Sequence, residues 1–218
     1  ANMLRIILVG MFSFVALPLA AKGPLPAKFT VDGQVLIYDT EMQILGEDAE
    51  MTVDDVDDLK DMLSKHPEVT ELQLNSSGGS VFAGEEMAWI VIDFGLDTTV
   101  SGECISACID LFLAGNRRRM TLGSKMGFHQ RRWAPKSVKS YYENWSAEEG
   151  WETPFDFGSW IYADTQTEIY QHLTYLIERG VDAGFAVETL RVDSGGEWYP
   201  SRLKLIAAGV LREDPMAN

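Results

Sequence analysis

Three groups of residues near the middle of the chain could together perform nucleophilic chemistry. Ser106 carries a hydroxyl at the expected start of a helix, and His129 is a base that follows later in the chain. Gly78-Gly79 leaves bare backbone whose N–H groups can approach a substrate closely. A serine hydroxyl is a weak nucleophile until a base takes its proton, and backbone N–H groups can stabilise the oxyanion that forms. These residue types suit a serine hydrolase.

Each of these residues also has a structural interpretation. A serine at the start of a helix often only caps it, and a pair of glycines often only forms a turn. The other two histidines are expected to be structural, since His66 precedes a proline at a helix end and His172 lies on a helix face. The chemical interpretation therefore depends on whether the fold brings Ser106, His129 and the glycines together.

Strands and helices should alternate through this part of the chain. Two consecutive units of strand, small-residue turn and helix are expected, followed by further extended chain. The expected segments are strand 69–74, turn 75–80, helix 81–94, strand 96–100, turn 101–106, helix 107–114, and extended chain at 120–122 and 125–129. This alternation favours an α/β fold with a mostly parallel sheet. Because such folds build their sites at the carboxyl ends of the strands, the two turns should lie together.

The flanking segments have their own local signals. A β-hairpin is expected at 29–38 around Asp32-Gly33, and a helix is expected from an N-cap at Thr52 to His66-Pro67. The acids at the start of this helix suit its dipole; they are Asp54, Asp55, Asp57 and Asp58. Residues 131–161 concentrate Trp and Tyr, which either pack a helical arm or form a lid, groove or subunit interface. Helices are expected again at 165–179, 183–190 and 201–208.

The composition is that of one globular domain with an acidic surface. The chain has 218 residues, 46% of them hydrophobic, and a formal net charge of −15, which excludes nucleic acid as a partner. The two cysteines, Cys104 and Cys108, are too few for a disulfide framework. In an oxidising compartment they could form one disulfide around Ser106, and a zinc site with His129 and His172 is the alternative. The zinc signature is weak, and we expect no metal and no other cofactor.

The first 21 residues have the pattern of a secretory signal peptide. Arg5 precedes an apolar run at 6–17, which is shorter than the about 20 residues of a membrane span. We expect cleavage near Ala21 and a single domain at 22–218 that is periplasmic or secreted. A retained N-terminal membrane anchor is the alternative. Met3 is the expected start, so residues 1 and 2 are expected to be additions before it.

Four short motifs follow one another in a fixed order. They are Asn75-Ser76-Ser77-Gly78-Gly79, Gly102-Glu103-Cys104-Ile105-Ser106-Ala107, Ala114-Gly115 and Gly127-Phe128-His129-Gln130. Their order and spacing resemble the Clp protease proteolytic-subunit (ClpP) family. The resemblance implies an α/β fold of the ClpP/crotonase type, a spiral of ββα units with a mostly parallel sheet. It also implies Ser106 as nucleophile, His129 as general base, and the N–H groups of Gly79 and Ala107 as the oxyanion hole.

The resemblance does not extend evenly along the chain. It is strongest over 70–130, continues over 185–211 and is poor over 131–165, so residues 131–179 are expected to form an atypical aromatic-rich, helical arm. When the chain is aligned with the family from the terminal helix backwards, the family's catalytic Asp corresponds to Glu197. Asp193 is the alternative acid. The Cys-x-Ser-Ala-Cys turn makes the chain similar to exported ClpP-like proteins.

These observations lead to one expected function and one alternative. The expected function is an exported, ATP-independent serine peptidase that hydrolyses peptide bonds in a peptide or protein substrate. It is expected to form a homo-oligomer and to work without a cytosolic unfoldase, because an exported protein is out of reach of one. The alternative is a catalytically weak or inactive interaction or scaffold module on the same fold, since a fold does not fix a function.

Overall fold

The computed structural model describes residues 28–42 and 49–214, and the expected signal peptide lies outside them. Within these residues, six strands form one sheet with the order β1-β2-β3-β4-β5, and β6 pairs with β4. The strands are β1 (Phe29–Asp32), β2 (Val35–Asp39), β3 (Glu71–Ser76), β4 (Asp97–Ile105), β5 (Arg118–Met120) and β6 (Lys125–Gly127). Only β1 and β2 pair antiparallel. The predicted hairpin and the predicted mostly parallel sheet are therefore confirmed.

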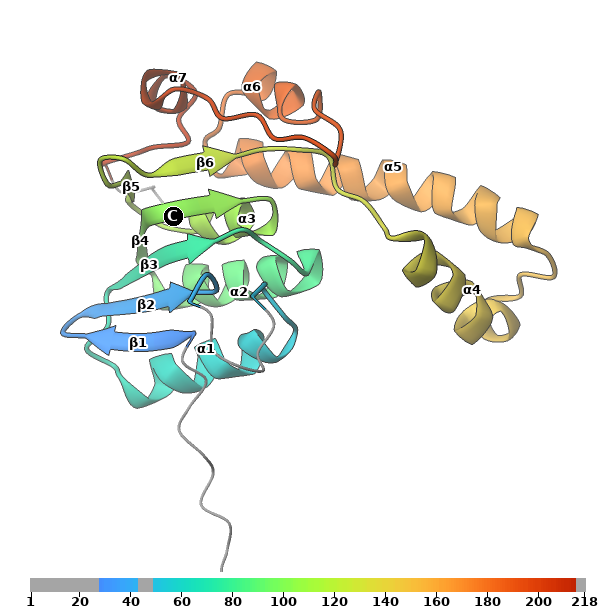
Figure 1. The fold of residues 1–218 in the computed structure, drawn as a ribbon, viewed down its shortest axis with the longest axis horizontal. Helices are drawn as coiled ribbons and strands as arrows, with labels where there is room; N and C mark the ends of the chain where they lie inside the picture. The colour runs from blue at the N-terminus through green and yellow to red at the C-terminus, as the bar shows by residue number, and fades with distance from the viewer. Residues whose placement is uncertain (1–27, 43–48, 215–218) are drawn as a thin grey trace, which may run out of the picture.

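Helices lie against the sheet and also extend away from it (Figure 1). They are α1 (Asp54–Lys65), α2 (Val81–Phe94), α3 (Ala107–Leu113), α4 (Pro135–Glu149), α5 (Pro154–Glu178), α6 (Ala183–Glu188) and α7 (Arg202–Ala207). Helices α2 and α3 pack closely, since a Cβ added to Gly84 would lie 2.7 Å from the carbonyl oxygen of Ala107. The core combines apolar residues of the strands and of these helices, including Leu72, Leu74, Met87 and Phe112.

Helix α2 begins and ends where its local signals predict. The hydroxyl of Ser80 accepts a hydrogen bond from the N–H of Ala83 at 3.2 Å, which satisfies one of the free amides of the first turn. Gly95 ends the helix in the left-handed conformation, with φ of 65°. The chain after β3 is therefore held in place by an ordinary serine cap.

Strand β4 is longer than the sequence indicates. Residues 101–105 were expected in a turn, but β4 continues through them to Ile105. Its first half pairs with β5 at 98–100, and its second half pairs with β6 at 103–105. Gly102 lies between the halves with φ of 121°, and the side chain of Asn75 accepts the N–H of Glu103 at 3.0 Å. The turn prediction was wrong because the partners that make this segment a strand come from a distant part of the sequence.

The start of α1 also differs from the prediction. The N-cap is Val53 rather than Thr52, and the carboxylate of Asp55 accepts the N–H of Thr52 at 2.8 Å. Asp55 is buried and also binds Lys28 at 3.1 Å and the hydroxyl of Tyr38 at 2.6 Å. One of the acids at the start of α1 is thus a buried structural group that ties α1 to β2 and to the residue before β1.

Helices α4 and α5 form an arm that projects from the sheet (Figure 1). A helix was expected only from residue 165, but α5 begins at Pro154, where Thr153 and Asp156 form a reciprocal capping box. Aromatic rings fill the space between the two helices, with centroids 5.8 Å apart for Tyr141 and Trp160 and 4.8 Å apart for Trp151 and Trp160. On the inner face of the arm, the aromatic residues therefore pack the two helices together, as one of the two interpretations predicted. Among the described helices, none is both long enough and apolar enough to cross a membrane.

A buried arginine joins the ends of three helices. The guanidinium of Arg118 donates to the carbonyl oxygens of Leu113 at 3.1 Å, Arg179 at 2.8 Å and Gly209 at 2.6 Å. Burial and the neighbouring cations Arg179 and Arg212 lower the pKa of Arg118 to about 10. Because those carbonyls end α3, α5 and α7, the arginine fixes the part of the fold from which the arm departs.

Candidate active site

Ser106 connects β4 to α3 in an unusual backbone conformation. Its φ is 57° and its ψ is −125°, and among the described residues it alone has a positive φ without being a glycine. Its hydroxyl makes no capping hydrogen bond to α3. A side chain in such a conformation costs of order 1–3 kcal/mol and persists where the surroundings enforce it. Ser106 is therefore not a helix cap.

The Gly78-Gly79 turn packs directly on this strained residue. A Cβ added to Gly78 would lie 2.9 Å from the Cβ of Ser106 and 3.2 Å from the amide nitrogen of Ala107. The φ of Gly79 is 143°, and Met51 holds the turn, since its N–H donates to the carbonyl of Gly78 at 2.7 Å. Within residues 28–42 and 49–214, the N–H groups of Gly79 and Ala107 donate no hydrogen bond. Both amides are thus free to bind an oxyanion.

Strand β6 brings His129 to the same edge of the sheet. Gly127 pairs with Ile105, and the carbonyl of Gly127 accepts the N–H of Ser106 at 3.1 Å. Ser106 and His129 both line a cavity of about 30 Å³, which has room for about one water molecule. No direct hydrogen bond between their side chains occurs in this structure, although such contacts are often long before substrate binds.

The tautomer of His129 follows from its contact. Its Nδ1 lies 2.7 Å from the carbonyl oxygen of Gln130. A carbonyl oxygen only accepts hydrogen bonds, so in the neutral ring Nδ1 carries the proton and Nε2 the lone pair. This is the tautomer that a general base facing a serine hydroxyl requires.

The two acids considered for His129 have other partners. Glu197 accepts from the hydroxyl of Tyr199 at 3.0 Å, and Asp193 accepts from the N–H of Gly195 at 2.9 Å. Their segment nevertheless runs beside His129, since Trp198 pairs with Phe128. Contact between either acid and His129 is not seen among the described residues, and the role of each stays a prediction.

A disulfide brackets the serine. Cys104 at the end of β4 and Cys108 in α3 are bonded to each other, with their Cα atoms 5.3 Å apart, and both are buried. The bond ties the strand to the helix on either side of Ser106, so both sulfurs are occupied and are not zinc ligands in this structure. In the part of the chain that the structure describes, no group of three His, Cys, Asp or Glu side chains could hold a metal ion.

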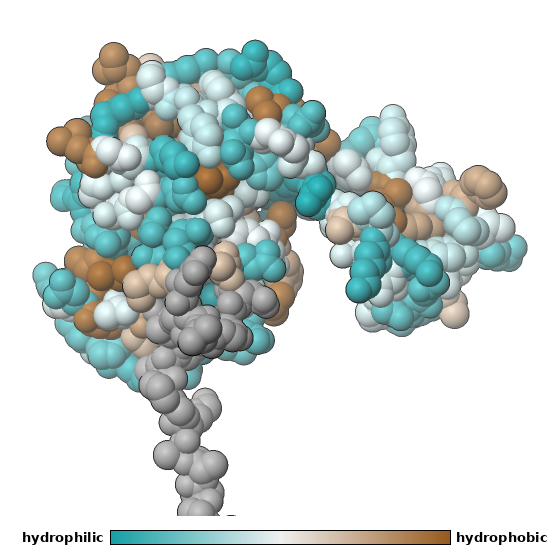
Figure 2. Space-filling model, in the orientation of Figure 1, coloured by the Kyte–Doolittle hydropathy of each residue, from teal (hydrophilic) through white to brown (hydrophobic). Residues whose placement is uncertain are grey.

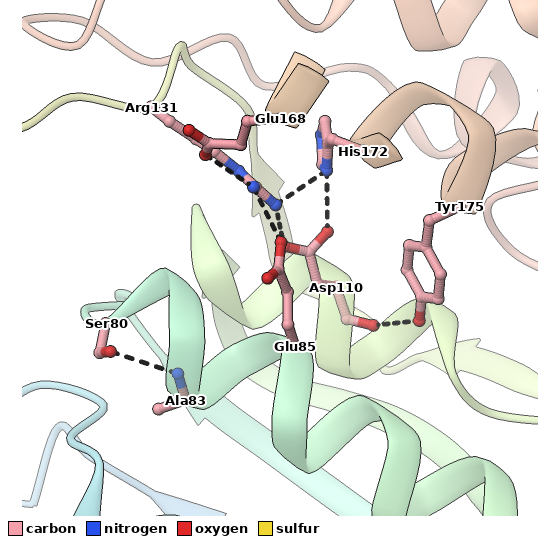
Figure 3. Close-up of polar contacts among 8 residues, drawn as sticks. All are labelled: Ser80, Ala83, Glu85, Asp110, Arg131, Glu168, His172 and Tyr175. Atoms are coloured by element: carbon pink, nitrogen blue, oxygen red, sulfur yellow. Dashed lines mark hydrogen bonds and ion pairs between the residues drawn. The ribbon is translucent and has the colours of Figure 1, made fainter. Parts of the chain in front are cut away.

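An ionic cluster centred on the buried Asp110 was not expected from the sequence (Figure 3). The carboxylate of Asp110 binds Arg131 at 2.8 Å and lies 3.3 Å from Nδ1 of His172. Burial raises the pKa of Asp110, but the contacts with His172 and Arg131 outweigh it and hold the pKa below its usual value. Arg131 also binds Glu85 at 2.9 Å and Glu168 at 3.0 Å.

The members of this cluster come from α2, α3, α5 and the segment after β6. Asp110, Arg131 and His172 line the same small cavity as Ser106 and His129. His172 had an ordinary interpretation as a residue on a helix face. No local pattern signals a contact between segments so far apart in the sequence.

Comparisons with known proteins find similarity in structure but none in sequence. No protein-family model matches the sequence, and no curated protein is significantly similar to it. A solved structure of a ClpP1 mutant from Listeria monocytogenes is similar in fold, with a TM-score of 0.48 and 16% sequence identity. The similarity covers 74% of this chain and 84% of that chain.

Proposed function

We propose that this chain is an exported, ATP-independent serine peptidase of the ClpP-like type, with Ser106 as its nucleophile. The observation that carries the proposal is the backbone of Ser106, which has a positive φ and no capping role. Strained backbone of this kind concentrates at functional sites. The free amides of Gly79 and Ala107 and the shared cavity with His129 support the same assignment.

The proposed reaction assigns each of these groups a role. Nε2 of His129 takes the proton of the Ser106 hydroxyl as Oγ attacks the carbonyl carbon of a peptide bond, and the N–H groups of Gly79 and Ala107 bind the resulting oxyanion. His129 then gives the proton to the leaving amine as the C–N bond breaks, which leaves an acyl-enzyme. A water molecule, deprotonated by His129, releases the second product and restores Ser106. These steps use no cofactor.

The group that orients His129 is part of the proposal. We assign this role in the resting enzyme to the carbonyl of Gln130, which holds the proton on Nδ1. Glu197 or Asp193 would first have to leave Tyr199 or Gly195. Glu197→Gln and Asp193→Asn decide between these assignments. If the carbonyl suffices, kcat/KM stays within about threefold, whereas a loss of about a thousandfold or more would identify that acid as the third catalytic group.

Self-association and export complete the proposal. Large apolar side chains remain exposed on the arm, including Phe155, Tyr162 and Tyr170, which are 86%, 73% and 70% exposed. Figure 2 shows hydrophobic residues on the visible face of the arm. Such surfaces are commonly covered by a partner, and we propose a second copy, to be tested by measuring the mass of the protein in solution. The proposed substrate is a peptide or protein. Because the chain is proposed to be exported, this substrate would reach it without a cytosolic unfoldase.

A fluorophosphonate probe tests the nucleophile directly. The probe should label the purified protein at Ser106, and Ser106→Ala should abolish both labelling and peptide hydrolysis. The matched control is Ser80→Ala, because Ser80 is a true cap and should not be needed for labelling. Absence of labelling at Ser106 in the folded protein would contradict the proposal. It would favour the interaction module, which retains the fold without the chemistry.

A further inference from the structure

A larger cavity of about 280 Å³ adjoins the one that contains Ser106. It lies between α2 and α5, and three residues line both cavities: Asp110, Arg131 and His172. Asp110 follows Ser106 by about one turn of α3, and a helical turn rises about 5.4 Å. Asp110, which lines the larger cavity, is therefore only about one helical turn away from Ser106.

The walls of the cavity carry more negative than positive charge. Glu85, Glu86 and Asp110 contribute carboxylates, and Arg131 is the cation among the lining residues. Arg131 is already bound by Glu85 and Asp110, and also by Glu168 outside the cavity. Oδ1 of Asp110 is buried and lies 3.3 Å from Nδ1 of His172. The cavity therefore favours a ligand that is positively charged.

Aromatic rings form the other wall. Trp89 is 56% exposed, and its ring lies edge-on to Tyr175 with centroids 6.4 Å apart. The hydroxyl of Tyr175 donates to the backbone carbonyl of Asp110 at 2.7 Å, which fixes this ring (Figure 3). Lysine and arginine pack their apolar stems on such rings while their charged ends reach carboxylates, and the ring faces also attract the cation.

We propose that this cavity is a specificity pocket that takes a lysine or arginine side chain next to the cleaved bond. The inference rests on the serine peptidase function proposed above. An acidic side chain would be repelled by the carboxylates that line the cavity. An apolar side chain would remove water from these carboxylates without offering them a partner. A basic side chain instead places its charge near Glu86 and Asp110 and its stem on Trp89.

Binding of p-aminobenzamidine, a fluorescent aromatic cation, tests the pocket without catalysis. The experiment uses the Ser106→Ala protein, and neutral p-aminobenzamide serves as the comparison ligand. The cation should bind more tightly than the amide. Glu86→Gln and Trp89→Ala should each weaken the cation by about three- to fivefold. Glu148→Gln on the exposed face of α4 removes the same charge as Glu86→Gln but should leave binding unchanged.

Peptide substrates that differ only at the residue before the cleaved bond test the pocket during catalysis. Arginine or lysine there should raise kcat/KM at least about tenfold over norleucine, and more over glutamate. Glu86→Gln should reduce this preference. It should leave the rate of fluorophosphonate labelling at Ser106 unchanged, because Glu86 is not among the residues that line the cavity of Ser106.

The two experiments separate failure of the pocket from failure of the peptidase. Labelling of Ser106 together with equal or better cleavage after norleucine would overturn the pocket and keep the peptidase. Equal binding of p-aminobenzamidine and p-aminobenzamide would also overturn the pocket. Absence of Ser106 labelling would overturn the peptidase function, while tight binding of the cation that depends on Glu86 would still support a cation-binding pocket.

Discussion

Ser80 and Ser106 each precede a helix, and they should respond in opposite ways to substitution. Ser80 caps α2 through its hydroxyl, whereas Ser106 precedes α3 without capping it. Ser80→Ala should therefore cost stability and leave the chemistry intact. Ser106→Ala should abolish the chemistry, lowering kcat by at least about a thousandfold, and leave stability nearly unchanged.

The magnitudes follow from the local structure. Removal of a serine cap costs about 1 kcal/mol of unfolding free energy, which lowers Tm by about 2–4 °C in a protein of this size. Ser106→Gly should instead raise stability. The substitution relieves backbone strain of about 1–3 kcal/mol at a φ of 57°. The greater conformational freedom of glycine in the unfolded chain lowers the unfolding free energy by about 0.5–1 kcal/mol. A net gain of about 1 kcal/mol is expected.

Urea unfolding followed by tryptophan fluorescence measures the stabilities, and fluorophosphonate labelling measures the chemistry. The disulfide must stay intact in all variants, so the cysteines are titrated before each measurement. Two outcomes would refute the reasoning. If Ser106→Gly is less stable than Ser106→Ala, the conformation of Ser106 is not strained. If Ser106→Ala is destabilised as much as Ser80→Ala, Ser106 serves as a cap after all.

Three further predictions concern the surroundings of the serine. Cys104→Ala with Cys108→Ala should lower the unfolding free energy by about 2 kcal/mol in urea, because so short a loop restricts the unfolded chain only slightly, and should slow labelling of Ser106. Gly78→Ala should reduce labelling at least about a hundredfold, because its Cβ would lie 2.6 Å from the carbonyl of Ile105 at a φ of 96°; in Gly158→Ala, where nothing lies within 4 Å, labelling should not change. Asp110 has a lowered pKa in the fold, so it contributes stability above its unfolded pKa of about 4 that is lost as the pH falls through the folded value. Asp110→Asn should therefore flatten the dependence of urea stability on pH below about 4, and an unchanged slope would contradict this.

Local signals were sufficient where the structure depends on neighbouring residues. The Asp32-Gly33 turn acts within a few residues, as do the Ser80 cap and the Gly95 end of α2, and the hairpin expected at 29–38 and the helix expected at 81–94 are both present. The extension of β4 through Glu103 was not predictable in this way. Its pairing with Lys125 in β6 is a contact between distant segments that no local pattern specifies.

The candidate site also combines features that the sequence suggested with features that only the structure shows. The types and order of residues 78–79, 106 and 129 were sufficient to suggest nucleophilic chemistry. They could not show that the serine hydroxyl leaves α3 uncapped, nor that the carbonyl of Gln130 holds Nδ1 of His129. Those features depend on the dihedral angles and side-chain directions that packing imposes.

The sequence by itself determined the α/β alternation, the residue types of the site and their order along the chain, because these rest on periodicity and local turn chemistry. The tertiary structure alone decided the strain at Ser106, the contact of Gly78 with it, and the meeting of Asp110, Arg131 and His172 beside it. The physical reason is that parallel strands and the helices between them join residues distant in sequence. The energy of those contacts depends on distance and burial, and neither can be read from the order of the residues.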